Sequence, residues 1–142
     1  MASLSGKVAI ITGASSGIGR AIAERFAQDG AIVLVNYAEH AEKAQDVVTG
    51  IQSKGGKAVA VQADMSQVAK ARRLVLDTFR QFSRLDILVN NAGKFMPKLL
   101  VEMTEVELDQ IMALQAKGPY FAMQEAGKVL KDGGRIVNIS SE

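Results

Sequence analysis

The sequence has no cysteine and only one histidine, His40. Without a thiol the chain forms no disulfide and no thiolate metal site, and a single imidazole excludes a histidine cluster. The carboxylates are scattered over predicted helix faces, so no metal is expected. A large excess of one charge is also lacking. The 17 basic and 15 acidic side chains leave a net charge of +2, which does not predict a nucleic-acid-binding surface.

Targeting signals and long hydrophobic runs are also missing. The first residues, MASLSGK, contain no apolar segment of a signal peptide, and no apolar run approaches the ~20 residues that span a bilayer. These features predict a cytoplasmic protein. A length of 142 residues suits a single domain over residues 1–142, and 48% hydrophobic residues are typical of a globular fold.

Short apolar runs alternate along the chain with longer segments of helical periodicity. This alternation predicts βαβ units and therefore an α/β fold with a parallel sheet. None of the apolar runs alternates regularly with polar residues, as expected for strands covered by helices on both faces. Five strands are expected, at residues 8–11, 32–35, 58–61, 85–89 and 135–139.

Four main helices are expected between these strands. The first covers about 17–28 and ends at Gly30, and the second covers about 39–53 and ends at Gly55 and Gly56. The third follows Ser66 as its N-cap, and the fourth runs from a capping box at 104–107 to about 130, with a kink at Pro119. Right-handed crossovers then give a doubly wound, Rossmann-type sheet that binds its ligand beyond the carboxyl ends of the strands.

The segment TGASSGIG, residues 12–19, leads from the first strand into the first helix. A diphosphate needs close approach to backbone N–H groups, and the positive end of a helix favours it electrostatically. Gly13 frees the turn after the strand, Gly17 lets backbone and ligand meet, and Gly19 lets the helix pack on the sheet. The alternative is a glycine-rich turn without a ligand, but the βαβ frame around the motif favours nucleotide binding.

The spacing Gly-x-x-x-Gly-x-Gly differs from the common dinucleotide fingerprint, and TGASSGIG resembles the short-chain dehydrogenase/reductase family. Three further segments are similar to that family and follow its order: Ala63-Asp64, NNAG at 90–93 and GGRIVNISS at 133–141. Within the family, the chain resembles the NADP-dependent 3-oxoacyl-[acyl-carrier-protein] reductase-like members. The resemblance covers the whole chain, which then ends after the fifth strand of the family fold.

The resemblance implies a dinucleotide site. Asp64 would hydrogen-bond the adenine amino group, Met65 would lie beside the ring, and 91–93 would line the adenosine and ribose. The alternatives are a turn aspartate for Asp64 and an ordinary loop for NNAG. The full set of expected cofactor-binding residues is Gly13, Ser15, Ser16, Gly17, Ile18, Gly19, Asn36, Tyr37, Asp64, Met65, Asn91, Ala92 and Gly93.

The end of the second strand bears on the choice of cofactor. An acidic residue there would bind the ribose 2′-hydroxyl of NAD, but the sequence reads VNY, with Asn36 and Tyr37. The absence of a carboxylate predicts a preference for NADP(H) over NAD(H), although Ser16 stands where many NADP-preferring relatives carry a basic residue. Ser15, Tyr37, and either His40 or Lys43 are candidates for contacting the phosphate.

The catalytic residues of the family are only partly present. By resemblance, Ser141 is the catalytic serine, with Ser140 as the alternative, and Gln115 stands where the family has asparagine. The family's Tyr-x-x-x-Lys motif is absent, because Ala41 lies four residues after Tyr37 and Gln124 lies four residues after Tyr120. The 142-residue chain alone is therefore expected to be inactive, and to lack the catalytic helix, last strands and substrate lid of its relatives.

Three interpretations follow. The first is the cofactor-binding part of an oxidoreductase that moves hydride between nicotinamide and a small carbonyl or alcohol. It would form a homo-oligomer, because the fifth strand and the fourth helix would otherwise be exposed. The second is a non-catalytic nucleotide-binding or interaction module. The third, a nucleic-acid binder, is suggested only by a basic stripe of the kind that is far more often a solvated helix face: Lys70, Arg73, Arg80 and Arg84.

Overall fold

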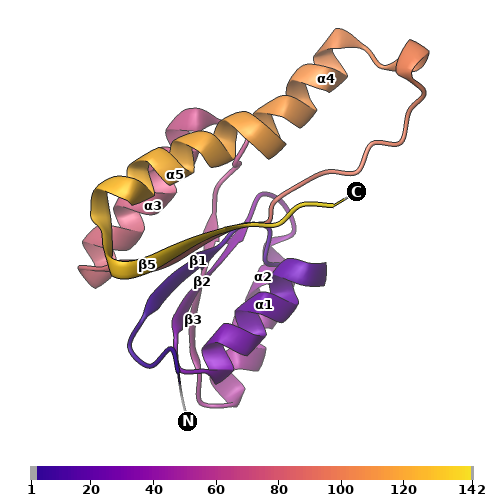
Figure 1. The fold of residues 1–142 in the computed structure, drawn as a ribbon. Helices are drawn as coiled ribbons and strands as arrows, with labels where there is room; N and C mark the ends of the chain where they lie inside the picture. The colour runs from indigo at the N-terminus through magenta and orange to yellow at the C-terminus, as the bar shows by residue number, and fades with distance from the viewer. Residues whose placement is uncertain (1–2, 142) are drawn as a thin grey trace.

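Five parallel strands form one sheet in the order β3-β2-β1-β4-β5 (Figure 1). The computed structural model describes residues 3–141. The order of the strands reverses between β1 and β4, so the carboxyl ends of these two strands mark the switch point at which doubly wound sheets bind ligands. The strands are β1 (Val8–Ile11), β2 (Ile32–Tyr37), β3 (Lys57–Gln62), β4 (Leu85–Asn90) and β5 (Leu130–Asn138).

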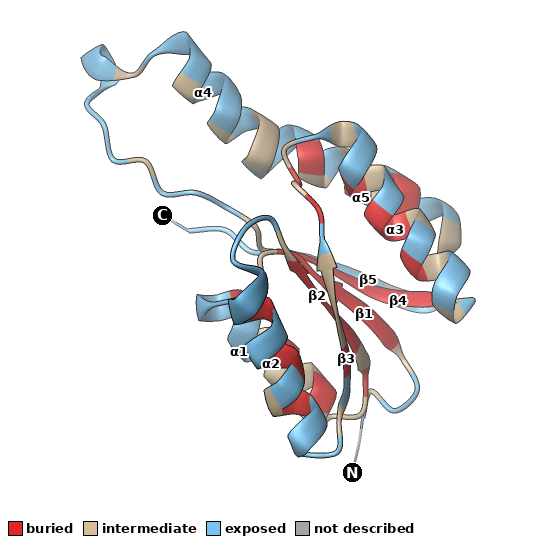
Figure 2. Ribbon diagram, turned by 180° about the vertical axis from the view of Figure 1, so that it is seen from behind, coloured by how far each residue is buried: buried red, intermediate tan, exposed pale blue. Residues whose placement is uncertain are grey.

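Helices cover both faces of this sheet. On one face lie α1 (Gly17–Gln28) and α2 (Ala41–Ser53), and on the other lie α3 (Val68–Phe82) and α5 (Gly118–Val129) (Figures 1 and 2). Ala9 and Ile11 belong to the apolar cluster under α1 and α2, whereas Val8 and Ile10 belong to the cluster under α3 and α5. The predicted doubly wound Rossmann-type fold is confirmed.

Most predicted boundaries hold, and the exceptions have local causes. Gly30 and Gly55 end α1 and α2 with φ of 99° and 83°, as their sequence positions predict. Helix α2 starts at Ala41 and not at 39, because His40 takes a left-handed φ of 63°. Ser66 does not cap α3, since its hydroxyl donates to Asp64 at 2.6 Å and Gln67 is the N-cap.

The predicted fourth helix is a chain of three segments. Helix α4 (Glu105–Met112) begins with the predicted capping box, a π-helical turn follows at Ala113–Lys117, and α5 continues from Gly118. The irregularity therefore comes just before Pro119. Proline has no N–H to offer to the carbonyl of residue 115, so the α-helical hydrogen-bond register does not continue through this point.

Strand β5 is longer and less regular than predicted. It begins at Leu130, which pairs with Leu85, but the register then jumps so that Arg135 pairs with Ile87. The residues between form an excursion in which Gly133 has a φ of 81°. In the described sheet β5 is an edge strand, and Ile136 and Val137 on it are partly exposed.

Helix α4 and the loop before it project from the body of the protein (Figures 1 and 2). None of the residues of α4, all of which the structure describes, is buried. Phe95 and Leu100 in the loop are 88% and 93% exposed. The other exposed apolar side chains of this arm are Leu99, Val101, Val106, Leu108 and Met112. No helix within residues 3–141 is long and apolar enough to cross a membrane.

Candidate functional site

The loop between β1 and α1 lies at the switch point and is shaped by its glycines. Gly13 and Gly17 have φ of 62° and 57°, a region that side chains disfavour. A Cβ on Gly13 would lie 2.9 Å from Cα of Ala92, and one on Gly19 would clash with the carbonyl oxygen of Gly13. A Cβ on Gly17, in contrast, would meet nothing within 4 Å. Gly13 and Gly19 thus permit internal packing, and Gly17 faces open space.

The loop after β4 is tied to the glycine loop by Thr12, which the sequence interpretation did not include among the site residues. The Thr12 hydroxyl accepts hydrogen bonds from the backbone N–H groups of Asn91 and Ala92, both at 2.9 Å. The Asn91 side chain returns two bonds, to the carbonyl oxygens of Thr12 and Gly13, each at 3.1 Å. Thr12 and the side chain of Asn91 therefore position the two loops against each other.

Asn36 joins a third segment to the same framework. Its side chain is 1% exposed, accepts from the N–H of Gly13 at 3.2 Å, and donates to the carbonyls of Val61 and Ala63 at 3.3 and 3.2 Å. Its backbone carbonyl also accepts from the N–H of Ala14. Because these bonds occupy the buried amide, Asn36 holds the glycine loop in place from inside.

The start of α1 offers backbone donors to an anion. The first hydrogen bond of the helix runs from the N–H of Arg20 to the carbonyl of Ser16. The N–H groups of the three preceding residues, Gly17, Ile18 and Gly19, have no acceptor within residues 3–141. The N-cap Ser16 makes no side-chain capping bond. Ser16 and Ile18 are exposed, and Ser15 is half-buried. Unpaired amides at the positive end of a helix fit a diphosphate.

Asp64 lies after the carboxyl end of β3, as predicted, in a hydrogen-bonded turn. One carboxylate oxygen accepts from the hydroxyl and the N–H of Ser66, at 2.6 and 3.0 Å, and the other accepts from Gln67 at 3.2 Å. The hydrogen bond from the Ser66 hydroxyl is the main cause that holds the pKa of Asp64 below its usual value, so the carboxylate is an ionised acceptor at neutral pH. Met65, which was expected beside the adenine ring, is 2% exposed and packs in the core under α3 and α5.

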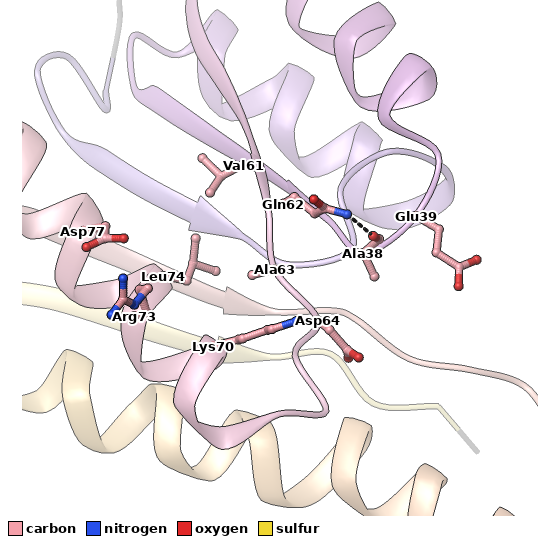
Figure 3. Close-up of a pocket in the computed structure, with 10 residues that line it drawn as sticks. All are labelled: Ala38, Glu39, Val61, Gln62, Ala63, Asp64, Lys70, Arg73, Leu74 and Asp77. Atoms are coloured by element: carbon pink, nitrogen blue, oxygen red, sulfur yellow. Dashed lines mark hydrogen bonds between the residues drawn. The ribbon is translucent and has the colours of Figure 1, made fainter.

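A hollow of about 500 Å³ opens beside Asp64, between the end of β3 and helix α3 (Figure 3). Gln62 closes one side by donating to the carbonyl of Ala38 at 3.1 Å, and Lys70 points toward Asp64. The remaining lining residues are Glu39, Val61, Ala63, Arg73, Leu74 and Asp77. No residue of the glycine loop lines this hollow, so it adjoins the candidate site without being its centre.

The residues expected near a 2′-phosphate lie at the end of β2. Tyr37 is the last residue of the strand and is half-buried against the cluster under α1 and α2. His40 and Lys43 are exposed, and His40 lies 3.7 Å from Glu42. No carboxylate follows Asn36 until Glu39, so the edge of the site beside Tyr37 carries no fixed negative charge from β2.

The two expected catalytic residues lie on different elements. Gln115 is in the π-helical turn, and its side-chain oxygen is 2.9 Å from the position a Cβ on Gly93 would take. Ser141 follows the end of β5 and is exposed. The structure thus brings Gln115 to the loop after β4. Among residues 3–141, no three potential metal-ligating side chains gather at one place.

The sequence matches the model of the short chain dehydrogenase family over residues 7–142. An uncharacterised oxidoreductase of Methylorubrum extorquens is 50% identical over 141 residues, which are 99% of this chain and 57% of the relative. Elsinochrome reductase 1 of Elsinoe fawcettii is 44% identical, over 97% of this chain and 52% of the relative. The chain spans about half the length of the curated relatives it matches.

Solved structures give the same result. A short-chain dehydrogenase of Burkholderia cenocepacia in complex with NADP superposes with a TM-score of 0.92 at 44% identity, over 95% of this chain and 55% of that one. A blue fluorescent protein from a metagenomic library, in complex with NADPH, gives a TM-score of 0.92 at 40% identity, over 97% of this chain and 57% of that one.

Proposed function

The chain belongs to the short-chain dehydrogenase family, and from this membership we propose that it is the cofactor-binding part of an NAD(P)-dependent oxidoreductase. The whole protein would transfer hydride between nicotinamide and a small carbonyl or alcohol. The observation that carries this proposal is the start of α1 at the switch point of the sheet, where the N–H groups of Gly17, Ile18 and Gly19 have no acceptor within 3–141.

The residues of the chain divide into two roles. Ser15, Ser16, Gly17 and Ile18 surround the free amides and would hold the diphosphate, and Asp64 would accept a hydrogen bond from the adenine amino group. Thr12, Asn36 and the side chain of Asn91 keep the loops in register through hydrogen bonds between these segments. The cofactor, when bound, supplies or accepts the hydride, and this chain orients it.

We further propose a preference for NADP(H) over NAD(H). Two structural neighbours are complexes with NADP or NADPH. In this chain, the residue that ends β2 is Tyr37, which has no charge to repel a 2′-phosphate, and the exposed Lys43 is close by in the sequence. Replacing Tyr37 with aspartate should weaken the binding of NADPH more than that of NADH, because the carboxylate repels the 2′-phosphate. The ratio of the NADPH to the NADH dissociation constant should rise about tenfold or more.

Proton transfer needs a group that this sequence does not contain. The Tyr-x-x-x-Lys motif of the family has no counterpart in residues 1–142, so we propose Ser141 and Gln115 only as partial contributors to a catalytic centre. The second candidate, a non-catalytic nucleotide-binding module, is separated from the first by the reading frame. A continuation that encodes Tyr-x-x-x-Lys favours the enzyme, and a stop codon after Glu142 favours the module.

We also propose that the protein forms homo-oligomers. The supporting observation is the arm of loop and α4, whose apolar side chains are exposed in the single chain. Size-exclusion chromatography with light scattering tests this: a mass at least twice 15.1 kDa is expected, and a monomer at all concentrations would contradict it.

The test of the cofactor proposal is a fluorescence titration of NADPH with the purified chain. Saturable binding is expected. Ser16→Asp should weaken it at least tenfold while leaving the melting temperature unchanged or higher, because aspartate is a good N-cap but repels a diphosphate. The matched control is Thr104→Asp, which places the same charge at the N-cap of α4 and should leave binding unchanged. Absence of saturation in the unmodified chain, or equal binding by the Ser16 variant, would refute the proposal.

A further inference from the structure

The dipeptide Asp-Gly occurs twice in the chain, at Asp29-Gly30 and at Asp132-Gly133. In this dipeptide the backbone nitrogen of the glycine can attack the side-chain carboxyl of the aspartate, because the glycine has no side chain to obstruct the approach. The reaction requires that both groups are free to meet. The two copies share the same local chemistry, so the fold decides whether they differ in reactivity.

The first copy ends helix α1 and is held by hydrogen bonds. The carboxylate of Asp29 accepts from Nε of Arg25 at 3.0 Å, and its backbone carbonyl accepts from the N–H of Leu4 at 2.9 Å. The N–H of Gly30 donates to the carbonyl of Ala27 at 3.0 Å. The attacking nitrogen and the carboxylate are thus both engaged, and the reaction would first have to break these contacts.

The second copy lies in the excursion of β5, just after the chain turns out of α5 (Figure 1). Residues 131–134 have no partner in the register with β4. Asp132 and Gly133 are both exposed, and the side chain of Asp132 forms no hydrogen bond or ion pair with any residue of 3–141. A Cβ on Gly133 would meet nothing within 4 Å, so the backbone next to Asp132 borders open space. The contacts that restrain the first copy are therefore missing here.

We propose that Asp132 is a modification site, at which the chain isomerises spontaneously to isoaspartate. The nitrogen of Gly133 forms a bond to Cγ of Asp132, its proton is lost, and one carboxyl oxygen leaves as water. Water then opens the cyclic imide at the backbone carbonyl, so that the main chain continues through Cγ and the former backbone carbonyl becomes a free carboxylate. One water is lost and one is regained, and nothing is oxidised or reduced.

The modification lengthens the main chain by one carbon at a place that tolerates it. The excursion makes no ladder pairs with β4, and the paired part of β5 begins only at Arg135. The added carbon therefore does not require a pair of the sheet to separate. This inference does not depend on the proposed cofactor site, because the residues that carry it belong neither to the glycine loop nor to the loop after β4.

The experiment is a prolonged incubation of the purified, folded chain at neutral pH, followed by proteolysis and mass spectrometry. Electron-transfer fragmentation distinguishes the two linkages in the peptides that contain Asp29 and Asp132. Isoaspartate should accumulate at Asp132 at least about tenfold faster than at Asp29, because the hydrogen bonds at the end of α1 must open before Asp29 reacts. Isoaspartate at Asp132 that is no more abundant than at Asp29 would overturn the proposal.

Three controls show that the fold makes the difference. In urea sufficient to unfold the chain, the two copies should react at rates within about threefold of each other, because the protection of Asp29 is lost. Asp132→Glu should abolish the product at that position, since glutamate would have to form a larger ring. Asp132→Asn should accelerate it, since ammonia replaces water as the leaving group. Product at Asp132 in urea but not in the folded chain would show that the excursion is held as firmly as the end of α1, and would also overturn the proposal.

Discussion

The carboxylate of Asp86 accepts a hydrogen bond from the backbone N–H of Val8 at 2.9 Å, although the two residues are 78 positions apart in the sequence. Arg84 donates two further bonds to the same carboxylate, both at 2.8 Å. Asp86 is only 3% exposed. The contact joins β1 and β4 at the amino-terminal ends of the strands, opposite the candidate site. It can therefore affect stability without touching a ligand.

Asp86→Ala should therefore lower the free energy of unfolding by about 2–3 kcal/mol, because it leaves a buried N–H without an acceptor. Urea denaturation followed by circular dichroism measures the change. The matched control is Asp46→Ala on α2, an exposed aspartate, which should change stability by less than about 0.5 kcal/mol. Equal effects of the two substitutions would show that the Val8 contact contributes nothing.

The same carboxylate predicts how stability depends on acid. In the folded chain, the pKa of Asp86 lies below its ordinary value of 3.8, and the hydrogen bond from Arg84 is the main cause. Because the pKa of this carboxyl is lower in the folded chain than in the unfolded chain, its ionised form stabilises the fold. This stabilisation is complete above the pKa of the unfolded chain and is lost as the pH falls through the pKa of the folded chain. The free energy of unfolding should thus decrease as the pH drops below about 4.

Asp86→Asn tests this pH dependence, since the amide does not titrate. Its free energy of unfolding should fall less steeply between pH 5 and pH 2 than that of the unmodified chain. Asp46→Asn, the control, should keep the steep decline. Parallel curves for Asp86→Asn and the unmodified chain would mean that Asp86 has no lowered pKa in the folded state.

The sequence was sufficient for the fold and for the roles of the glycines. Apolar runs without alternation predicted strands buried on both faces, and Ala9 and Ile10 do face opposite helix layers. Gly13 and Gly19 permit the close packing expected of them. Such features follow from local rules, because the spacing of strand, glycine turn and helix restricts the backbone to few conformations.

Side-chain direction and long-range contacts could not be predicted in the same way. Whether Asn36 faces the ligand-binding end of the sheet or the interior depends on the length of β2 and on the carbonyls of Val61 and Ala63, which are 25 and 27 residues away. The burial of Met65 depends on α3 and α5 meeting above it. The role of Thr12 depends on a loop 79 residues later. These outcomes arise from tertiary packing, which periodicity does not encode.

Gly50 and Gly55 should respond in opposite directions to the same substitution. Gly50 lies inside α2, and a Cβ there would meet nothing within 4 Å, so Gly50→Ala should stabilise the protein by about 0.5–1 kcal/mol through helix propensity. Gly55 has a φ of 83°, so Gly55→Ala should destabilise it by about 1 kcal/mol. Thermal unfolding of both variants compares them directly, and a decrease for Gly50→Ala would contradict the open space beside that residue.

Gly17 and Gly19 should separate ligand binding from folding. A methyl group on Gly19 would lie 2.5 Å from Nδ2 of Asn91 and would clash with Gly13, so Gly19→Ala should cost about 1–3 kcal/mol of stability. Gly17→Ala meets no atom within 4 Å and should cost only about 1–2 kcal/mol for its left-handed φ.

The binding measurements then discriminate between the two positions. At a temperature where both variants remain folded, Gly17→Ala should lose at least tenfold in NADPH affinity, because its methyl group occupies the space through which the diphosphate approaches the free amides of α1. Gly55→Ala serves as the control, since it adds similar left-handed strain far from the glycine loop and should bind NADPH normally. Unchanged affinity in Gly17→Ala would mean that the open side of the loop is not where the ligand lies, even if the unmodified chain binds NADPH.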